Sequence, residues 1–97
     1  MLPSFLREEA RRDLQIAANW YEARQRGLGD VFLDEFLSCV DQVEELPQSG
    51  ERIDADVRRM LLNRFPYAIF YTIEPTHIEV LGVLHCRRHP EIWRSRL

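Results

Sequence analysis

Hydrophobic side chains recur at helical spacing in the first half of the chain and at alternate positions in the second half. Residues 7–26 carry an apolar residue at every third or fourth position, which predicts a first helix. A second stripe predicts another helix, which begins at residue 28 or 30 and ends at residue 46, before Pro47. The first stripe consists of Ala10, Leu14, Ala17, Ala18 and Tyr21, and the second of Phe32, Phe36, Cys39, Val40, Val43 and Leu46.

The connection between the two predicted helices is short and rich in glycine. Residues 26–29 include Gly27, which suits the C-cap of the first helix because glycine adopts a left-handed backbone freely. Two helices joined by so few residues pack antiparallel, so the sequence predicts a helical hairpin.

The period changes to two after residue 56, where β-branched and aromatic residues become frequent. Strands are predicted over residues 57–63, 67–73 and 78–84, and their tight connections indicate an antiparallel meander. Leu2 to Leu6 could add a strand, which Pro3 would confine to an edge of the sheet. Residues 90–96 predict one or two closing helical turns, with Pro90 at the first helical position. A helical half followed by a strand half is typical of the α+β class.

Length and composition limit the organisation of the chain. Its 97 residues are expected to form one domain, 1–97. A hydrophobic content of 45% with 30% charged residues favours a folded protein over a disordered one. No apolar run approaches a membrane span, and the N-terminus lacks a signal-peptide pattern. Cys39 and Cys86 have no paired spacing, so we expect reduced thiols and a cytoplasmic protein.

Charge differs between the two halves. Residues 1–50 hold five arginines against ten acidic residues, whereas residues 51–97 hold eight arginines against six. The chain has no lysine, and its formal net charge is −3. This charge is unsuited to a protein that grips nucleic acid by neutralising phosphates, so no direct nucleic-acid binding is expected.

One string of residues resembles a known family signature. Residues 64–71, RFPYAIFY, resemble the RFPYxIxY signature of ParE-like toxins in the RelE/ParE toxin superfamily. Three further stretches agree in order and spacing over residues 10–96: ANWYE at 18–22, GLG at 27–29 with Phe32, and VLGVLH at 80–85 with Arg88, Pro90, Trp93 and Arg96. The resemblance implies an N-terminal antiparallel helical hairpin packed on a three- to four-stranded twisted antiparallel sheet, with a short C-terminal helix.

The resemblance also implies a function, and the superfamily offers two. RelE-like members are ribosome-dependent endoribonucleases that cut messenger RNA, and ParE-like members poison DNA gyrase and are neutralised by a cognate antitoxin. Nuclease members place a basic residue where this chain has Ala68. We therefore expect the toxin component of a type II toxin–antitoxin module that inhibits DNA gyrase by binding. The alternatives are an RNase of the RelE type and a degenerate, non-toxic member that still binds the antitoxin.

The RNase alternative would need residues that move protons and stabilise a charged phosphorane. Its candidates are His85, Arg87, Arg88 and Tyr71, whereas a binding toxin would have no catalytic residue. His85 could instead fix the departing tail at the end of the sheet. A metal site from Cys39, His85, Cys86 and His89 has no known ligand spacing, so no metal or cofactor is expected.

A binding toxin needs two interaction surfaces. The basic segment from His85 onward is the candidate for the target, because Trp and Arg dominate interface energies. We predict that an apolar flank of the helical hairpin accepts an amphipathic antitoxin helix. The predicted target-binding residues are His85, Arg87, Arg88, Trp93, Arg94 and Arg96, and the predicted antitoxin-binding residues are Ile16, Trp20, Leu33 and Leu37. Alternatively, Trp93 closes the core, and the hairpin residues pack on the chain's own sheet or tail.

Overall fold

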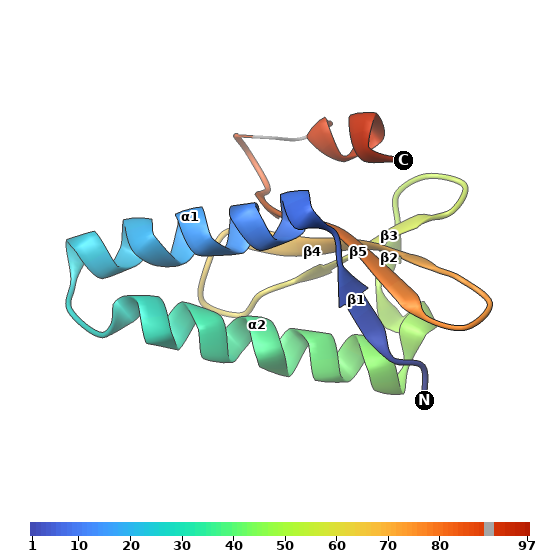
Figure 1. Ribbon diagram of the computed structural model, residues 1–97, viewed down its shortest axis with the longest axis horizontal. Helices are drawn as coiled ribbons and strands as arrows, with labels where there is room; N and C mark the ends of the chain where they lie inside the picture. The colour runs from blue at the N-terminus through green and yellow to red at the C-terminus, as the bar shows by residue number, and fades with distance from the viewer. Residues whose placement is uncertain (89–90) are drawn as a thin grey trace.

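Two helices precede most of a five-stranded sheet in the computed structural model, which describes residues 1–88 and 91–97 (Figure 1). The helices are α1 (Glu8–Arg24) and α2 (Leu28–Glu45), and the 3-10 helices are η1 (Pro47–Ser49) and η2 (Ile92–Arg96). The strands are β1 (Ser4–Leu6), β2 (Glu51–Arg52), β3 (Val57–Leu61), β4 (Tyr67–Ile73) and β5 (Ile78–His85). The predicted α+β class, helical hairpin and closing turns are confirmed, except that the prediction for Pro90 lies outside the described residues.

The strands lie in the order β1-β5-β4-β3-β2. The predicted meander is confirmed, because β3, β4 and β5 pair antiparallel in sequence. The strand predicted near the N-terminus exists at the edge, but it runs parallel to β5, so the sheet is mixed rather than wholly antiparallel. The short strand β2 was not predicted, since two residues carry no periodic signal.

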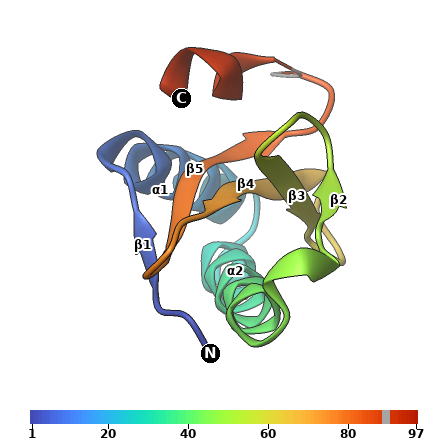
Figure 2. The same ribbon diagram turned by 90° about the vertical axis from the view of Figure 1, so that its right-hand side faces the viewer.

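The helices cover one face of the sheet, and the C-terminal segment covers the other (Figure 2). Tyr67, Ile69 and Tyr71 point toward the helices, where Phe32 and Phe36 of α2 complete the core. On the opposite face Trp93 belongs to a smaller apolar cluster. Its other members are Val57, Ala68, Phe70, Leu81 and Leu84. Strand β4 is therefore buried on both faces, which explains its continuous run of apolar residues.

The hairpin connection is held by a carboxylate rather than by a glycine C-cap. Helix α1 ends at Arg24 with Gln25 as its C-cap, and Gly27 adopts a left-handed φ of 88° directly before α2. Glu22 accepts hydrogen bonds from the backbone N–H groups of Gly27 and Gly29, at 3.0 Å each. A carboxylate at this position stabilises the positive end of the α2 dipole. The prediction of a C-cap glycine for the first helix is wrong, because this glycine begins the second helix.

The residues of the RFPYAIFY string hold the sheet against α2. The backbone N–H and Nε of Arg64 donate to the Glu35 carboxylate at 2.9 and 2.5 Å. The hydroxyl of Tyr71 donates to the Pro47 carbonyl at 2.6 Å and accepts from the Gly50 N–H at 3.1 Å. The Arg64 contact fastens the turn before β4 to α2. The Tyr71 contact fastens β4 to η1 and Gly50, which follow α2, so both contacts are structural.

Among the described residues, neither helix combines the length and apolarity that crossing a bilayer requires.

Removal of the Tyr71 hydroxyl should destabilise the fold. Tyr71→Phe leaves the Gly50 N–H and the Pro47 carbonyl without their partner, at a cost of about 1–3 kcal/mol. Tyr67→Phe, on the same strand, is the matched control and should change the free energy of unfolding by less than about 0.5 kcal/mol. Urea unfolding measures the free energy of unfolding of both variants. Equal losses would contradict a structural role for the Tyr71 hydroxyl.

The contact between Glu35 and Arg64 should make stability depend on pH. Burial acts to raise the pKa of Glu35, but hydrogen bonds from Arg64 outweigh it and hold that pKa below its ordinary value of 4.5. A carboxyl with a lowered folded pKa stabilises above its unfolded pKa and loses that contribution as pH falls through its folded pKa. Glu35→Gln should therefore cost stability at pH 7 and little at pH 3. Glu45→Gln, an exposed α2 control, should cost little at either pH in urea unfolding.

Candidate functional site

An ion pair locks the C-terminal segment to α1. Arg96 Nη1 lies 2.5 Å from Asp13 Oδ2, and Nη2 lies 3.2 Å from Oδ1, so the pairing is bidentate. Both side chains are largely buried, with 12% and 14% of their surface exposed. Arg96 also donates to the Leu81 carbonyl at 3.1 Å, and Asp13 accepts from the Val83 N–H at 3.1 Å. The extra hydrogen bonds satisfy a pair that would otherwise be costly to bury.

The sheet explains why this ion pair forms where it does. Strand β1 pairs only with Ile78–Val80, so the rest of β5 lacks a neighbouring strand on that side. The β4–β5 register shifts so that Leu81 stands outside the one-to-one pairing. Asp13 and Arg96 thus bind backbone groups at an open strand edge. Gly82 provides the space, because a Cβ there would lie 2.7 Å from Arg96 Nη1.

Three of the six predicted target-binding residues hold this segment in place. Arg96 makes the ion pair just described, and Trp93 is buried in the core on the second face of the sheet. The Arg94 guanidinium lies 4.7 Å from the centre of the Trp93 ring and 3.0 Å from the Asp54 carboxylate. Their interactions are with the chain itself.

The other three predicted target-binding residues lie together at the end of β5. His85 Nδ1 accepts hydrogen bonds from the backbone N–H groups of Arg87 and Arg88 at 3.1 and 3.2 Å. The His85 ring also packs edge-to-face on Tyr67 at 5.2 Å between centroids. His85 therefore shapes the turn, and both arginine side chains are exposed. Within residues 1–88 and 91–97, neither arginine has a carboxylate at ion-pair distance.

Two residues predicted to bind the antitoxin lie beside this turn. The Trp20 ring has the Arg24 guanidinium 3.8 Å from its centre and that of Arg88 at 5.7 Å. Ile16, one turn earlier in α1, lines a hollow of about 250 Å³ together with His85 and other residues. The structure therefore brings part of each predicted surface into contact. Arg24 was missed from the sequence, although its i+4 spacing from Trp20 is a usable signal.

The remaining two predicted antitoxin-binding residues lie elsewhere. Leu33 is half-buried and lines a separate hollow between the helices with Ala18 and Glu22. Leu37 follows one turn later on α2, with 57% of its surface exposed. The four residues therefore do not form one patch.

The residues considered for RNA cleavage are only partly brought together. Arg87 and Arg88 lie next to His85, but Tyr71 is fully buried four residues along β4 from Tyr67, the strand partner of His85. Four residues of strand span roughly 13 Å. Burial also raises the pKa of Tyr71, and its hydroxyl is bonded to backbone groups. Tyr71 is therefore not placed to act with His85.

The thiols show no arrangement suited to metal binding or nucleophilic chemistry. Burial raises the pKa of Cys39 to about 12, and its Sγ lies 3.7 Å from the Met60 carbonyl. Cys86 is half-buried, and burial raises its pKa as well. In the part of the chain that the structure describes, no three His, Cys, Asp or Glu side chains gather as metal ligands. His89 lies outside that part.

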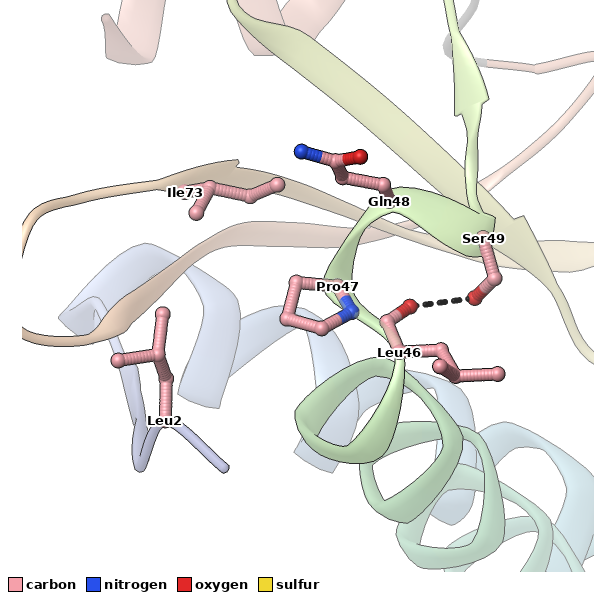
Figure 3. Close-up of a pocket in the computed structure, with 6 residues that line it drawn as sticks. All are labelled: Leu2, Leu46, Pro47, Gln48, Ser49 and Ile73. Atoms are coloured by element: carbon pink, nitrogen blue, oxygen red, sulfur yellow. Dashed lines mark hydrogen bonds between the residues drawn. The ribbon is translucent and has the colours of Figure 1, made fainter.

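A larger, open hollow of about 550 Å³ lies near the start of η1 (Figure 3). Its wall is mostly apolar, and its polar lining side chains are uncharged. Ser49 Oγ donates to the Leu46 carbonyl at 2.7 Å and so closes one side. The lining consists of Leu2, Leu46, Pro47, Gln48, Ser49 and Ile73. None of these side chains titrates, so this hollow offers no acid–base chemistry.

Comparison with known proteins identifies the family. A family model described as the ParE toxin of the type II toxin–antitoxin system, parDE, matches residues 5–90. The chain belongs to the ParE toxin family. A solved structure described as the chromosomal ParDE TA system from P. aeruginosa has the same fold as this ParE family member, with a TM-score of 0.64 and 21% identity. The alignment covers 88% of this chain and 96% of that one. The comparison with curated proteins found no match.

Truncation should lower the free energy of unfolding for one arginine of the predicted target-binding set and leave it nearly unchanged for another. Arg96→Ala leaves the largely buried Asp13 carboxylate without its cation, which should lower the free energy of unfolding by about 3 kcal/mol. Arg87→Ala removes an exposed side chain and should change it by less than about 0.5 kcal/mol. Urea unfolding of the two variants would contradict the account if their losses were similar.

Proposed function

We propose that this ParE family member is the toxin of a type II toxin–antitoxin module. It acts in the cytoplasm by binding and inhibiting DNA gyrase, and a cognate antitoxin neutralises it. The match to the ParE family model over residues 5–90 carries the toxin assignment. Gyrase as target rests on the resemblance of the RFPYAIFY string to ParE-like toxins.

The arrangement at the end of β5 supports binding rather than cleavage. Arg87 and Arg88 are exposed, and neither has a carboxylate partner among residues 1–88 and 91–97. Trp20 is 38% exposed and its ring centre lies 5.7 Å from the Arg88 guanidinium, so an aromatic ring and an exposed arginine are available together. Trp and Arg are the residues that contribute most often to interface hot spots. A protein target needs such a surface and no set of proton-transfer groups.

One observation favours the RelE-type RNase as the second candidate. The backbone of Arg87 and Arg88 is bonded to His85, whose ring contacts Tyr67 at the start of β4, so an imidazole and a phenol lie beside the turn that carries two arginines. General acid–base cleavage of RNA uses such groups. Against this, His85 Nδ1 accepts backbone hydrogen bonds, and Tyr71 is buried away from the turn.

A supercoiling assay with purified DNA gyrase tests the proposal. The wild-type toxin should inhibit supercoiling or trap a cleaved complex, and Arg87→Ala/Arg88→Ala should need at least tenfold more protein because two contact cations are lost. Arg11→Ala, an exposed arginine elsewhere on α1, is the matched control and should act within twofold of wild type. Absence of inhibition by the wild-type toxin at large excess would refute gyrase as the target.

His85→Ala separates the two candidate functions. A gyrase inhibitor should lose only part of its potency in this variant, because His85 shapes the turn of Arg87 and Arg88 but both cations remain. An RNase would lose its proton carrier and with it all cleavage. Primer extension on messenger RNA after induction should show no new ends for either protein. Codon-positioned cuts by the wild type that vanish in His85→Ala would establish the RNase instead. Binding of the antitoxin without either activity would identify a non-toxic member.

A further inference from the structure

Ile16, Trp20 and Arg24 follow one another at four-residue spacing on one face of α1. Arg88, in the chain after β5, approaches Trp20, and Ile16 lines a hollow together with Ile92. We call these residues and the hollow the α1–tail surface. Two guanidinium groups approach the Trp20 ring: that of Arg24 lies 3.8 Å and that of Arg88 lies 5.7 Å from its centre. The surface therefore has a basic, aromatic end and an apolar end.

The basic end attracts an anion. Both Arg24 and Arg88 approach the same indole ring, and the described residues provide no carboxylate at ion-pair distance from either. The nearby acids are already engaged, since Glu22 binds the start of α2 and Asp13 binds Arg96. Two neighbouring cations without counter-ions leave a local positive potential. Guanidinium groups bind carboxylates through two parallel hydrogen bonds.

The apolar end can receive an aliphatic side chain. The hollow between α1, β5 and η2 has a volume of about 250 Å³ and a largely apolar lining. Ile16 and Ile92 stand at its walls with 68% and 40% of their surface exposed. Covering these groups would remove apolar area from water. A single-stranded nucleic acid would satisfy the arginines but not this hollow, and the chain's net charge of −3 opposes it.

We propose that the α1–tail surface docks an acidic segment of the antitoxin that carries an aliphatic side chain. Carboxylates of the segment bind Arg24 and Arg88 next to Trp20, and its aliphatic side chain enters the hollow. Arg88 also belongs to the surface assigned above to the target. The antitoxin therefore neutralises by covering the same residues that the target needs, so the two proteins compete. This inference rests on the proposed toxin–antitoxin function, but not on gyrase being the target.

Binding of this chain to its cognate antitoxin tests the inference. Fluorescence anisotropy at 50 and 300 mM salt would give the dissociation constants. Trp20→Ala and Arg24→Glu/Arg88→Glu should each raise Kd at least tenfold, and the charge reversal should flatten its salt dependence. Arg24 and Arg88 are exposed, so the double variant should remain folded, which circular dichroism checks.

Three control variants test other positions. Arg11→Glu reverses an exposed charge on α1 away from Trp20, Leu37→Ala truncates α2, and Leu46→Ala opens the hollow of Figure 3. Each should change Kd by less than twofold. Unchanged binding of the Arg24→Glu/Arg88→Glu variant, or a larger loss in Leu37→Ala or Leu46→Ala than in Trp20→Ala, would overturn the inference.

A labelled single-stranded RNA of 20 nucleotides serves as a second probe. The RNA should bind weakly. If Trp20→Ala weakened RNA binding but left antitoxin binding unchanged, the inference would be overturned in favour of nucleic acid. Failure of the gyrase assay leaves these antitoxin measurements interpretable, so the two proposals fail independently. In competition, saturating antitoxin should abolish toxin binding to gyrase, and a stable ternary complex would contradict a shared surface.

Discussion

The ion pair between Asp13 and Arg96 joins α1, strand β5 and the C-terminal segment. Asp13 binds the backbone of β5 through the Val83 N–H, and Arg96 binds it through the Leu81 carbonyl. The pair thereby caps an edge that β1 leaves uncovered, and it seats the segment whose Trp93 closes the second face of the sheet. In a chain of 97 residues the buried core is small, so the loss of one such constraint is a large part of the total stability.

Some arginines are neutralised by a carboxylate of the chain, whereas those beside Trp20 are not within the described residues. Arg94 and Arg96 are fixed to carboxylates of the chain, and Arg64 is fixed to α2 in the same way. Arg24, Arg87 and Arg88 have no such partner among the described residues, and they lie around Trp20 and the end of β5. Exposed arginines such as Arg11 and Arg26 also lack a carboxylate partner among the described residues. The cations beside Trp20 differ from them in lying next to an aromatic ring, in a protein whose net charge is negative.

Much of the fold could be predicted because its signals are local. The stripe of Phe32 and Phe36 and the alternation of Tyr67, Ile69 and Tyr71 each identify an element and its buried face. The site could be predicted only in part, because Asp13 and Arg96 lie 83 residues apart and no local pattern links them. The rotation of each helix about its axis is also set by packing, which is why residues grouped as one flank in the sequence separate in the structure.

Acrylamide quenching of the Trp93 fluorescence tests the central claim, that the C-terminal segment is a locked part of the fold. The Trp20→Phe variant leaves Trp93 as the only tryptophan, and Trp93 is 3% exposed in the structure. The account predicts quenching several-fold weaker in the native protein than in urea, with protection lost at the same urea concentration as the helical signal. Quenching in the native protein as strong as in urea would show that the segment is not docked.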